Sequence, residues 1–368
     1  MAKPISFARG APSLDIIDVE GLRMAAERAF SADPAGVTAY GTAIGYPPLR
    51  QWIAERHQVE PEHVMVTNGS MQADAFLFDA LVEPGDAVIV ERPTYDRTLL
   101  SLHGRGADVR PVELEPDGID VAAVERVLDV VEPKLAHIIP NFQNPAGCTL
   151  SHAKRERLLE LARGHGFTIF EDDPYVALRF EGSPLPTMLS LDGDTVVYAS
   201  SFSKTVCPGI RVGYLVGSPE LIAQVVKIAA GTYISPNMVS QAIVHQFCIS
   251  GALDSSIETV NAALRERAAT LCEALRRELP EARFEEPEGG YFLWLELPRG
   301  TDVDAMFTRA ADRGVQFVKG SDFLLEGGSS SLRLAYSGVT PGEIEEGVKR
   351  LAEVYRDVTA GVETVDAA

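Results

Sequence analysis

Residues 195–217 read TVVYASSFSKTVCPGIRVGYLVG, two apolar, β-branched runs that flank a polar turn. Apolar runs of this length, bounded by glycine and proline, are typical of buried strands in a parallel sheet. Lys204 then lies at the end of a core strand, where burial of its charge is costly unless the amine has a partner or a chemical task. The stretch therefore predicts an α/β fold with a reactive lysine at one edge of its sheet.

The polar residues around Lys204 suit a ligand that carries both an aldehyde and a phosphate. A desolvated amine loses its proton more easily, and a neutral amine can form a Schiff base with an aldehyde. Ser201 and Ser203 offer hydroxyl groups and Arg211 offers a planar positive charge, a set that suits a phosphate. These features describe a site for pyridoxal phosphate (PLP). On this stretch alone, an exposed turn lysine remains the alternative.

The composition fits a globular protein of two domains, or of one large and one small domain. The chain has 368 residues, of which 46% are hydrophobic and 23% charged, and no apolar stretch approaches membrane-spanning length. Its net charge of -20 disfavours binding to nucleic acid or to anionic membranes. We therefore expect small-molecule substrates, and neither a nucleic-acid nor a membrane partner.

The sequence predicts a cytoplasmic location and no metal site. The N-terminus has no apolar segment of the signal-peptide kind. The four cysteines show no paired spacing and the seven histidines show no metal-ligand spacing, which favours buried thiols over a disulfide framework or a zinc site.

Residues 68–81 open a helix directly after a predicted strand at 64–67. The Gly69-Ser70 turn presents free backbone N–H groups and the positive end of the helix dipole, which suits a phosphate. Ser70 could equally be an ordinary helix N-cap, and the two uses are compatible.

Three further predicted strands end in residues whose side chains could bind a ligand or take part in a reaction. In α/β sheets, ligands bind outside the carboxyl ends of the strands. Tyr95 follows the strand at 87–91 and could stack on a flat ring or simply pack in the core. Asn144 lies in an Asn-Pro-x-Gly turn, from which its amide could point into the site. Carboxylates at 171–173 end an apolar strand, and one of them could keep a pyridine nitrogen protonated or serve as a helix N-cap.

Past about residue 253 the pattern changes to a long amphipathic helix, roughly 257–278, and several short strands. This indicates a small α+β domain with an antiparallel sheet. Arg333 lies on an otherwise apolar strand of this region, which is unusual for an unpaired arginine. It could clamp a substrate carboxylate or form a salt bridge.

Taken in order, these motifs resemble the fold-type I, PLP-dependent aminotransferases of class I/II. The resemblance is closest to the branch of the 2-aminoadipate and kynurenine aminotransferases and of the catalytic domains of MocR-type regulators, and it runs nearly end to end. The motifs are Thr67-Asn-Gly-Ser70, Pro93-Thr-Tyr95, Asn144-Pro-x-Gly147, Glu171-Asp-Asp-Pro-Tyr175, Ser201-Phe-Ser-Lys204, Arg211, Gly289-Gly-Tyr-Phe-Leu-Trp294 and Arg333.

The resemblance implies an aspartate-aminotransferase-like α/β fold, with a mostly parallel central sheet in a large PLP-binding domain at residues 48–252. Residues 1–47 and 253–368 are expected to form an N-terminal segment and a smaller α+β domain. The implied activity moves an amino group from an L-amino acid to a 2-oxo acid, with 2-oxoglutarate as the expected acceptor, by a ping-pong mechanism through a Schiff base on Lys204. A PLP-dependent lyase, racemase or decarboxylase is the alternative, because the fold does not choose among these reactions.

The resemblance also implies a role for each motif residue. Lys204 is expected to form the Schiff base and to shuttle the proton, Asp172 to pair with the ring nitrogen, and Tyr95 to stack on the ring. Asn144 and Tyr175 are expected to hydrogen-bond the phenolate oxygen of the ring. The residues expected to hold the phosphate are Ser70, Met71, Ser201, Ser203 and Arg211.

Substrate binding is expected to fall to Arg333, which would take the α-carboxylate together with Asn144. Arg9 and Gly10 belong to a loop that lines the substrate pocket in relatives. Tyr40 matches a tyrosine that reaches the phosphate of the neighbouring subunit, which implies a homodimer.

Two residues depart from the pattern of the family. Met71 replaces a usual glutamine, so only its backbone N–H could serve the phosphate. Arg9 replaces the first glycine of a usual Gly-Gly-x-Pro segment. Its charge could face an acidic substrate side chain or point to solvent.

Overall fold

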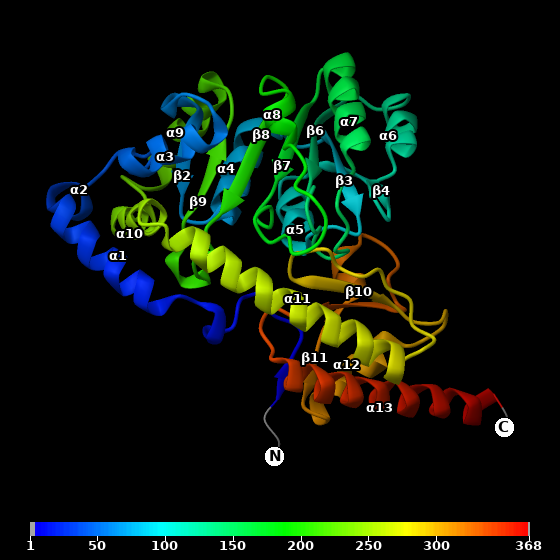
Figure 1. Ribbon diagram of the computed structural model, residues 1–368. Coiled ribbons are helices and arrows are strands. Elements are labelled where there is room, and N and C mark those ends of the chain that lie inside the picture. Colours follow the sequence, from blue (N-terminus) through cyan, green and yellow to red (C-terminus); the bar gives the residue numbers. More distant parts are fainter. Residues whose placement is uncertain (1–3, 367–368) are drawn as a thin grey trace.

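The computed structural model describes residues 4–366, and an eight-stranded sheet forms the core of its upper part in Figure 1. The order of strands across this sheet is β2-β9-β8-β7-β6-β3-β4-β5. The strands are β2 (Val64–Thr67), β3 (Ala87–Arg92), β4 (Asp108–Glu115), β5 (Gly118–Ile119), β6 (Pro133–Ile138), β7 (Thr168–Asp172), β8 (Val196–Ser201) and β9 (Gly213–Val216).

The sheet is mostly parallel, which confirms the predicted fold class. Strands β4, β3, β6, β7 and β8 run in one direction. Strand β9 is antiparallel to both of its neighbours, β8 and β2, so the prediction that both apolar runs of 195–217 are parallel strands was wrong for the second run. The polar turn between β8 and β9 is too short for the crossover that a parallel pair needs.

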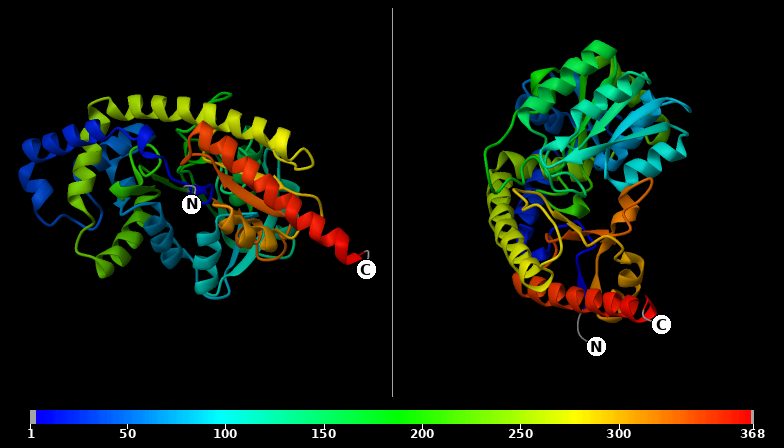
Figure 2. Two further views of the ribbon diagram at one scale, coloured as in Figure 1. Left: turned by 90° about the horizontal axis from the view of Figure 1, so that it is seen from below. Right: turned by 90° about the vertical axis from the view of Figure 1, so that its right-hand side faces the viewer.

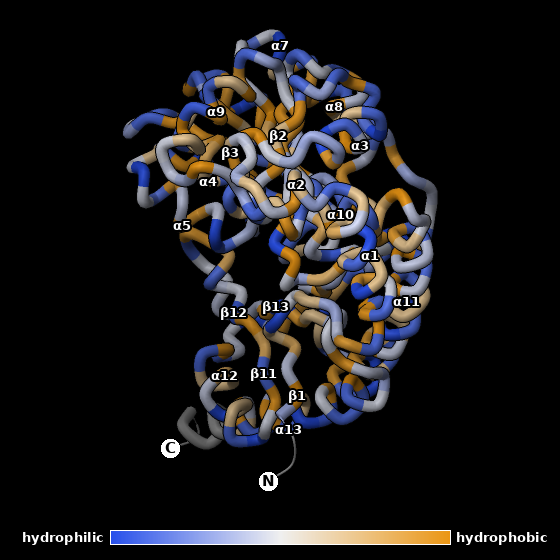
Figure 3. The backbone as a smooth tube through the Cα atoms, turned by 90° about the vertical axis from the view of Figure 1, so that its left-hand side faces the viewer, coloured by the Kyte–Doolittle hydropathy of each residue, from blue (hydrophilic) through white to orange (hydrophobic). Residues whose placement is uncertain are grey.

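Helices cover both faces of the sheet, so its strands are apolar on both sides. One apolar cluster includes residues of α3 (Pro47–His57), α6 (Val121–Leu128), α7 (His152–His165) and α10 (Met238–Ile249). The other includes residues of α4 (Ser70–Leu81), α5 (Asp96–Gly104) and α9 (Pro219–Thr232). Hydrophobic segments accordingly concentrate in the interior, at strands such as β2 (Figure 3).

The C-terminal region builds a second, antiparallel sheet in the order β10 (Phe292–Glu296), β13 (Ser331–Ala335) and β12 (Val318–Lys319). Helix α11 (Ala252–Glu278) leads from the large sheet to this region, where it packs against α13 (Pro341–Asp366) (Figure 2). One of the short strands expected in this region, which the sequence pattern places at 315–318, is split in the structure. Its first half, β11 (Val315–Gln316), pairs with β1 (Ile5–Ser6) instead of joining β12.

The remaining helices complete the described part of the chain. Helix α1 packs against α10, and its apolar residues belong to the same cluster as those of α10. None of the helices at residues 4–366 is long and apolar enough to cross a membrane. The division of the chain at residues 48 and 252 stays a prediction. The remaining helices of residues 4–366 are η1 (Leu14–Ile16), α1 (Val19–Ala32), α2 (Pro34–Thr38), η2 (Pro61–His63), α8 (Met188–Leu191), η3 (Pro208–Ile210), α12 (Val303–Asp312) and η4 (Gly320–Phe323).

A buried arginine fixes the chain where it leaves β6. Arg155 of α7 is fully buried, and its guanidinium donates to Oδ1 of Asn141 at 3.0 Å. It also donates to the backbone carbonyl oxygens of Leu150, Pro186 and Pro140. Because buried carbonyl groups are costly without a donor, this one side chain holds together three segments that border the carboxyl edge of the sheet.

Replacing Arg155 with alanine is therefore expected to lower the free energy of unfolding by about 3 kcal/mol or more, because several buried acceptors lose their donor. Arg157→Ala is the matched control on the exposed side of the same helix, where the side chain is 48% exposed and paired with Glu125 and Glu160. That variant is expected to lose less than about 1 kcal/mol. Denaturant unfolding measures both, and equal losses would contradict the anchoring role of Arg155.

Candidate active site

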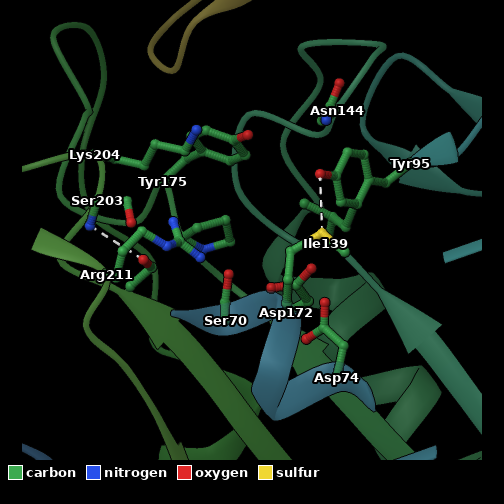
Figure 4. A pocket seen from close by; sticks show the side chains of 13 residues that line it. Ser70, Asp74, Tyr95, Ile139, Asn144, Asp172, Tyr175, Ser203, Lys204 and Arg211 are labelled. Atoms are coloured by element: carbon green, nitrogen blue, oxygen red, sulfur yellow. Dashed lines mark hydrogen bonds between the residues drawn. The ribbon is translucent and has the colours of Figure 1, made fainter. Parts of the chain in front are cut away.

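A cavity of about 140 Å³ lies at the carboxyl edge of the large sheet, next to the start of α4 (Figure 4). Its lining comes from the residues that follow β3, β6, β7 and β8. The cavity brings together most of the site residues predicted from the sequence. Those that line it are Ser70, Met71, Tyr95, Asn144, Asp172, Tyr175, Ser201, Ser203, Lys204 and Arg211.

Lys204 follows β8 and extends its amine into this cavity. Its Nζ donates a hydrogen bond to the carbonyl oxygen of Gly10 at 2.8 Å, and it lies 5.6 Å and 5.3 Å from the ring centres of Tyr175 and Tyr291. Burial of the amine, reinforced by the positive charge of Arg333, lowers the pKa of Lys204 to about 8. The enclosure therefore raises the share of uncharged amine near neutral pH, and the uncharged form is the nucleophile.

Hydrogen-bond donors gather where α4 begins. The cap position of this helix is Gly69, with a φ of 91°, so no side chain covers the first N–H groups. Ser203 Oγ is buried without a hydrogen-bond partner, and Ser201 Oγ accepts from the backbone N–H of Ser203 at 3.1 Å. Arg211 holds a left-handed φ of 52° and donates to the carbonyl oxygen of Asn68 at 3.3 Å.

Two glycines allow the backbone to close tightly around this corner. A Cβ at Gly69 would lie 2.3 Å from the guanidinium of Arg211. A Cβ at Gly213 would lie 2.5 Å from the backbone nitrogen of Ser70. A side chain at either position would fill the space that the hydroxyl groups and the helix N-terminus share.

Strand alternation directs one of three consecutive carboxylates into the cavity. Asp172, the last residue of β7, lines the cavity, and its Oδ1 is buried without a hydrogen-bond partner. Glu171 and Asp173 are bonded elsewhere. Glu171 accepts from two backbone N–H groups at the start of α8, and Asp173 accepts from the amide of Asn141.

Two tyrosines contribute hydroxyl groups that stay protonated at neutral pH. Tyr95 lies just before α5, donates to Sδ of Met71 at 3.3 Å, and has its pKa raised by burial to about 12. Tyr175 is buried beyond β7, and burial raises the pKa of its hydroxyl well above the ordinary value. Both groups can therefore donate hydrogen bonds to a ligand.

Arg333 of β13, in the C-terminal sheet, contacts Asn144, one of the residues that line the cavity. Its Nη1 donates to Oδ1 of Asn144 at 2.9 Å, and its Nη2 donates to the carbonyl oxygen of Ala8 at 2.7 Å. The guanidinium lies between two rings, 4.4 Å from the centre of Phe292 and 4.8 Å from that of Phe323. This packing holds the planar cation in one orientation, as recognition of a carboxylate requires.

Four of the predicted residues are not among those that line the cavity of this subunit: Arg9, Gly10, Tyr40 and Arg333. Arg9 is exposed, and Tyr40 has 82% of its surface exposed. Gly10, the neighbour of Arg9, takes part only through the carbonyl oxygen that accepts from Lys204.

Two groups beside Asp172 were missed by the sequence reasoning. Asp74 lines the cavity, and His137 Nε2 lies 3.5 Å from Oδ2 of Asp172. Asp74 follows Ser70 by one helical turn, so the two share a helix face. A lone carboxylate in the apolar run 73–78 was the available signal. His137 gave none beyond a polar residue in an apolar strand.

A mostly parallel sheet with a lysine of lowered pKa and an unpartnered carboxylate oxygen at its carboxyl edge is the arrangement that a PLP-dependent enzyme of fold type I needs. The model of the family "aminotransferase class I and II" matches residues 2–351. The chain belongs to this family.

Individual relatives agree with this assignment. A 2-aminoadipate transaminase of Thermus thermophilus is 34% identical, over 97% of this chain and 91% of the relative. The crystal structure of an α-aminoadipate aminotransferase from Thermus thermophilus, complexed with N-(5'-phosphopyridoxyl)-L-leucine, superposes with a TM-score of 0.93 at 34% identity, over 97% of this chain and 93% of that one. A kynurenine aminotransferase of Pyrococcus horikoshii has a TM-score of 0.92 at 32% identity, over 97% and 92% of the two chains.

These comparisons confirm the predicted resemblance, fold, enzyme class and cofactor. The protein is an aminotransferase and its cofactor is PLP. The roles predicted for individual side chains are not tested by them.

The lowered pKa of Lys204 has a direct chemical readout. In cofactor-free protein, the rate at which an amine-directed reagent labels Lys204 is expected to rise with pH through about 8 and then level off, because only the neutral amine reacts. An ordinary lysine titrates near ~10.4. Mass spectrometry of labelled peptides follows Lys204 and the exposed lysines in one digest. If the pH midpoint of the labelling rate of Lys204 coincided with that of the exposed lysines, the lowered pKa of Lys204 would be contradicted.

The glycine at 213 provides a test of the corner where α4 begins. If this corner binds the phosphate of PLP, Gly213→Ala should weaken PLP binding at least about tenfold, because the new Cβ would crowd the N–H of Ser70. Binding of pyridoxal, which lacks the phosphate, should change much less. Gly217→Ala is the matched control, since its Cβ would come no closer than 3.6 Å to a neighbouring atom. Equal losses for both ligands would assign the phosphate elsewhere.

Proposed function

We propose that this aminotransferase moves the amino group of an L-amino acid to 2-oxoglutarate by a ping-pong reaction in which Lys204 is the central residue. The observation that carries the proposal is the amine of Lys204, which has a pKa lowered to about 8 and shares one cavity with the unpartnered oxygen of Asp172. A nucleophilic amine and a buried anion in one enclosure are what PLP chemistry needs from a protein.

The cavity fits PLP on three sides. The free Oγ of Ser203, together with Ser70, Ser201, Arg211 and the backbone of Met71, supports a phosphate site at the start of α4. The unpartnered Oδ1 of Asp172 would accept from the protonated ring nitrogen. Tyr95 would stack on the ring, while Asn144 and Tyr175 would face its phenolate oxygen. When bound, PLP supplies an aldehyde carbon and a ring that withdraws electrons from the substrate.

Asp172 and Lys204 are proposed to act on two different protons of the reaction. Asp172, through its oxygen without a partner, would hold the proton of the ring nitrogen. The amine of Lys204 would take the proton from the α-carbon of the substrate as general base, and as general acid it would deliver a proton to the carbon on the other side of the amino nitrogen, which the cofactor supplies. Its lowered pKa suits both duties near neutral pH.

Arg333 is proposed to bind the α-carboxylate of the substrate, with Asn144 beside it. Its two terminal nitrogens already donate to oxygen atoms, those of Asn144 and Ala8. A carboxylate offers two oxygens in the same plane and would replace the carbonyl oxygen of Ala8. Held in this way, the substrate presents its α-hydrogen in a fixed orientation. Gly10 and Arg9 follow directly and would border the substrate side chain.

A homodimer and a cytoplasmic location complete the proposal. Tyr40 is a large aromatic residue with 82% of its surface exposed, and in a dimer it would reach the phosphate site of the neighbouring subunit. The solvent-facing position of Arg211 leaves that site open to such a contact. The four cysteines are unpaired, which fits a reducing compartment.

The amino donor is best sought among the substrates named for the relatives, 2-aminoadipate and kynurenine. The purified holoenzyme is mixed with each L-amino acid in the absence of an acceptor. A true donor converts the cofactor to its amine form, and added 2-oxoglutarate restores the original absorbance. Release of ammonia, carbon dioxide or the D-isomer without an acceptor would instead identify a lyase, decarboxylase or racemase.

Lys204→Ala is expected to reduce the rate of this conversion by about 10³-fold or more, because the variant has no group to move the proton. Lys134→Ala, which removes an exposed lysine of β6, serves as the matched control and should keep the wild-type rate. Stopped-flow absorbance measures both rates. A Lys204→Ala rate within tenfold of wild type would contradict the assignment of Lys204.

A further inference from the structure

Asp74 is a second carboxyl group at the floor of the cavity that neither the family assignment nor the proposed reaction uses. It lies on α4, one turn beyond Ser70, and is 6% exposed. Figure 4 shows it beside Asp172, with which it lines the same cavity. The charge of Asp172 also acts on the ionisation of Asp74, which places the two groups within electrostatic reach of each other.

The hydrogen-bond donors at this end of the cavity are too few for two carboxylates. Both Asp74 Oδ1 and Asp172 Oδ1 are buried without a partner. Oδ2 of Asp172 faces Nε2 of His137 at 3.5 Å. A protonated pyridine ring brings a single N–H donor, and the proposed function gives that donor to Asp172. Oδ1 of Asp74 is then left without a donor, and the backbone N–H of Asp74 itself is the one donor that acts on the ionisation of this carboxyl group. A buried carboxylate with so few donors is costly.

Electrostatics point the same way. Burial raises the pKa of Asp74 well above the ordinary value, and the neighbouring charge of Asp172 raises it further. Helix α9, which packs on α4, turns apolar residues toward it, and β2 contributes no charged side chain. The titratable or charged groups around this part of the cavity are Asp172 of β7, Tyr175 after β7, His137 of β6, Tyr95, Asp96 and Arg97 at the start of α5, Lys204 after β8 and Arg211 before β9.

We propose that Asp74 stays protonated in the working enzyme, so that Asp74 and Asp172 together present a single negative charge to the ring nitrogen. Asp74 is thus a positioning residue that acts through Asp172. The inference rests on the proposed function, because it assumes that Asp172 faces the ring nitrogen. Its consequence is an upper pH limit, above which Asp74 and Asp172 no longer present a single negative charge. When Asp74 ionises, a second negative charge arises beside the first, and the electronic state of the cofactor changes with it.

Infrared difference spectroscopy of wild type against Asp74→Asn tests the protonation directly. The full-length protein is measured at neutral pH, with and without PLP. The wild type is expected to show a protonated carboxyl band that Asp74→Asn lacks and that disappears on raising the pH. Asp79→Asn is the matched control, since Asp79 is an exposed aspartate of the same helix that pairs with Arg105. A difference spectrum with only ionised carboxylate bands at neutral pH would overturn the proposal.

The absorbance of the resting holoenzyme provides the readout that a purely structural role would not change. As the pH rises, the wild type should show a one-proton spectral step in parallel with the loss of the infrared band. Asp74→Asn should lose that step, and Asp79→Asn should keep it. A step retained in Asp74→Asn would assign it to another group and refute the coupling. Failure of wild type to bind PLP would refute the proposed function instead, while the infrared result without PLP would still report on Asp74.

Discussion

The removal of charge from water at the carboxyl edge of the large sheet is the constraint on which the rest of the site depends. The amine of Lys204 loses proton affinity there, and Asp172 keeps a buried oxygen without a donor. Each is costly in isolation, so the surrounding side chains must hold both in place. Unsatisfied groups of this kind identify the part of a protein that a ligand completes.

The strand ends combine a satisfied face with an unsatisfied one. Along β7, Glu171 accepts from backbone N–H groups of α8, while the next residue, Asp172, points into the cavity. Arg155 fixes the neighbouring segment after β6. A layer of polar groups that are hydrogen-bonded within the protein thus lies directly behind a layer that is open to a ligand. Because the period of a strand is two residues, three consecutive carboxylates can serve both layers.

The sequence could predict those parts of the fold and site that depend on local patterns. Apolar runs located the strands, and motifs at their ends located Lys204 and Asp172, because strand ends meet at one edge of a sheet. The reversed direction of β9 and the split between β11 and β12 depend on which partners the strands find. Asp74 and the carbonyl oxygen of Gly10 reach the cavity only through tertiary packing. The one local sign was the lone carboxylate of Asp74 in the apolar run 73–78.

The N-terminal segment occupies a hydrogen-bond donor that the proposed substrate carboxylate would need. Its carbonyl oxygen at Ala8 accepts from Arg333, and its carbonyl oxygen at Gly10 accepts from Lys204. A hydrogen bond of this kind contributes about 0.5–1.5 kcal/mol. If Arg333 binds the α-carboxylate as proposed, an amino acid would recover the bond that the Ala8 carbonyl gives up. A simple amine has no carboxylate and would recover nothing at Arg333.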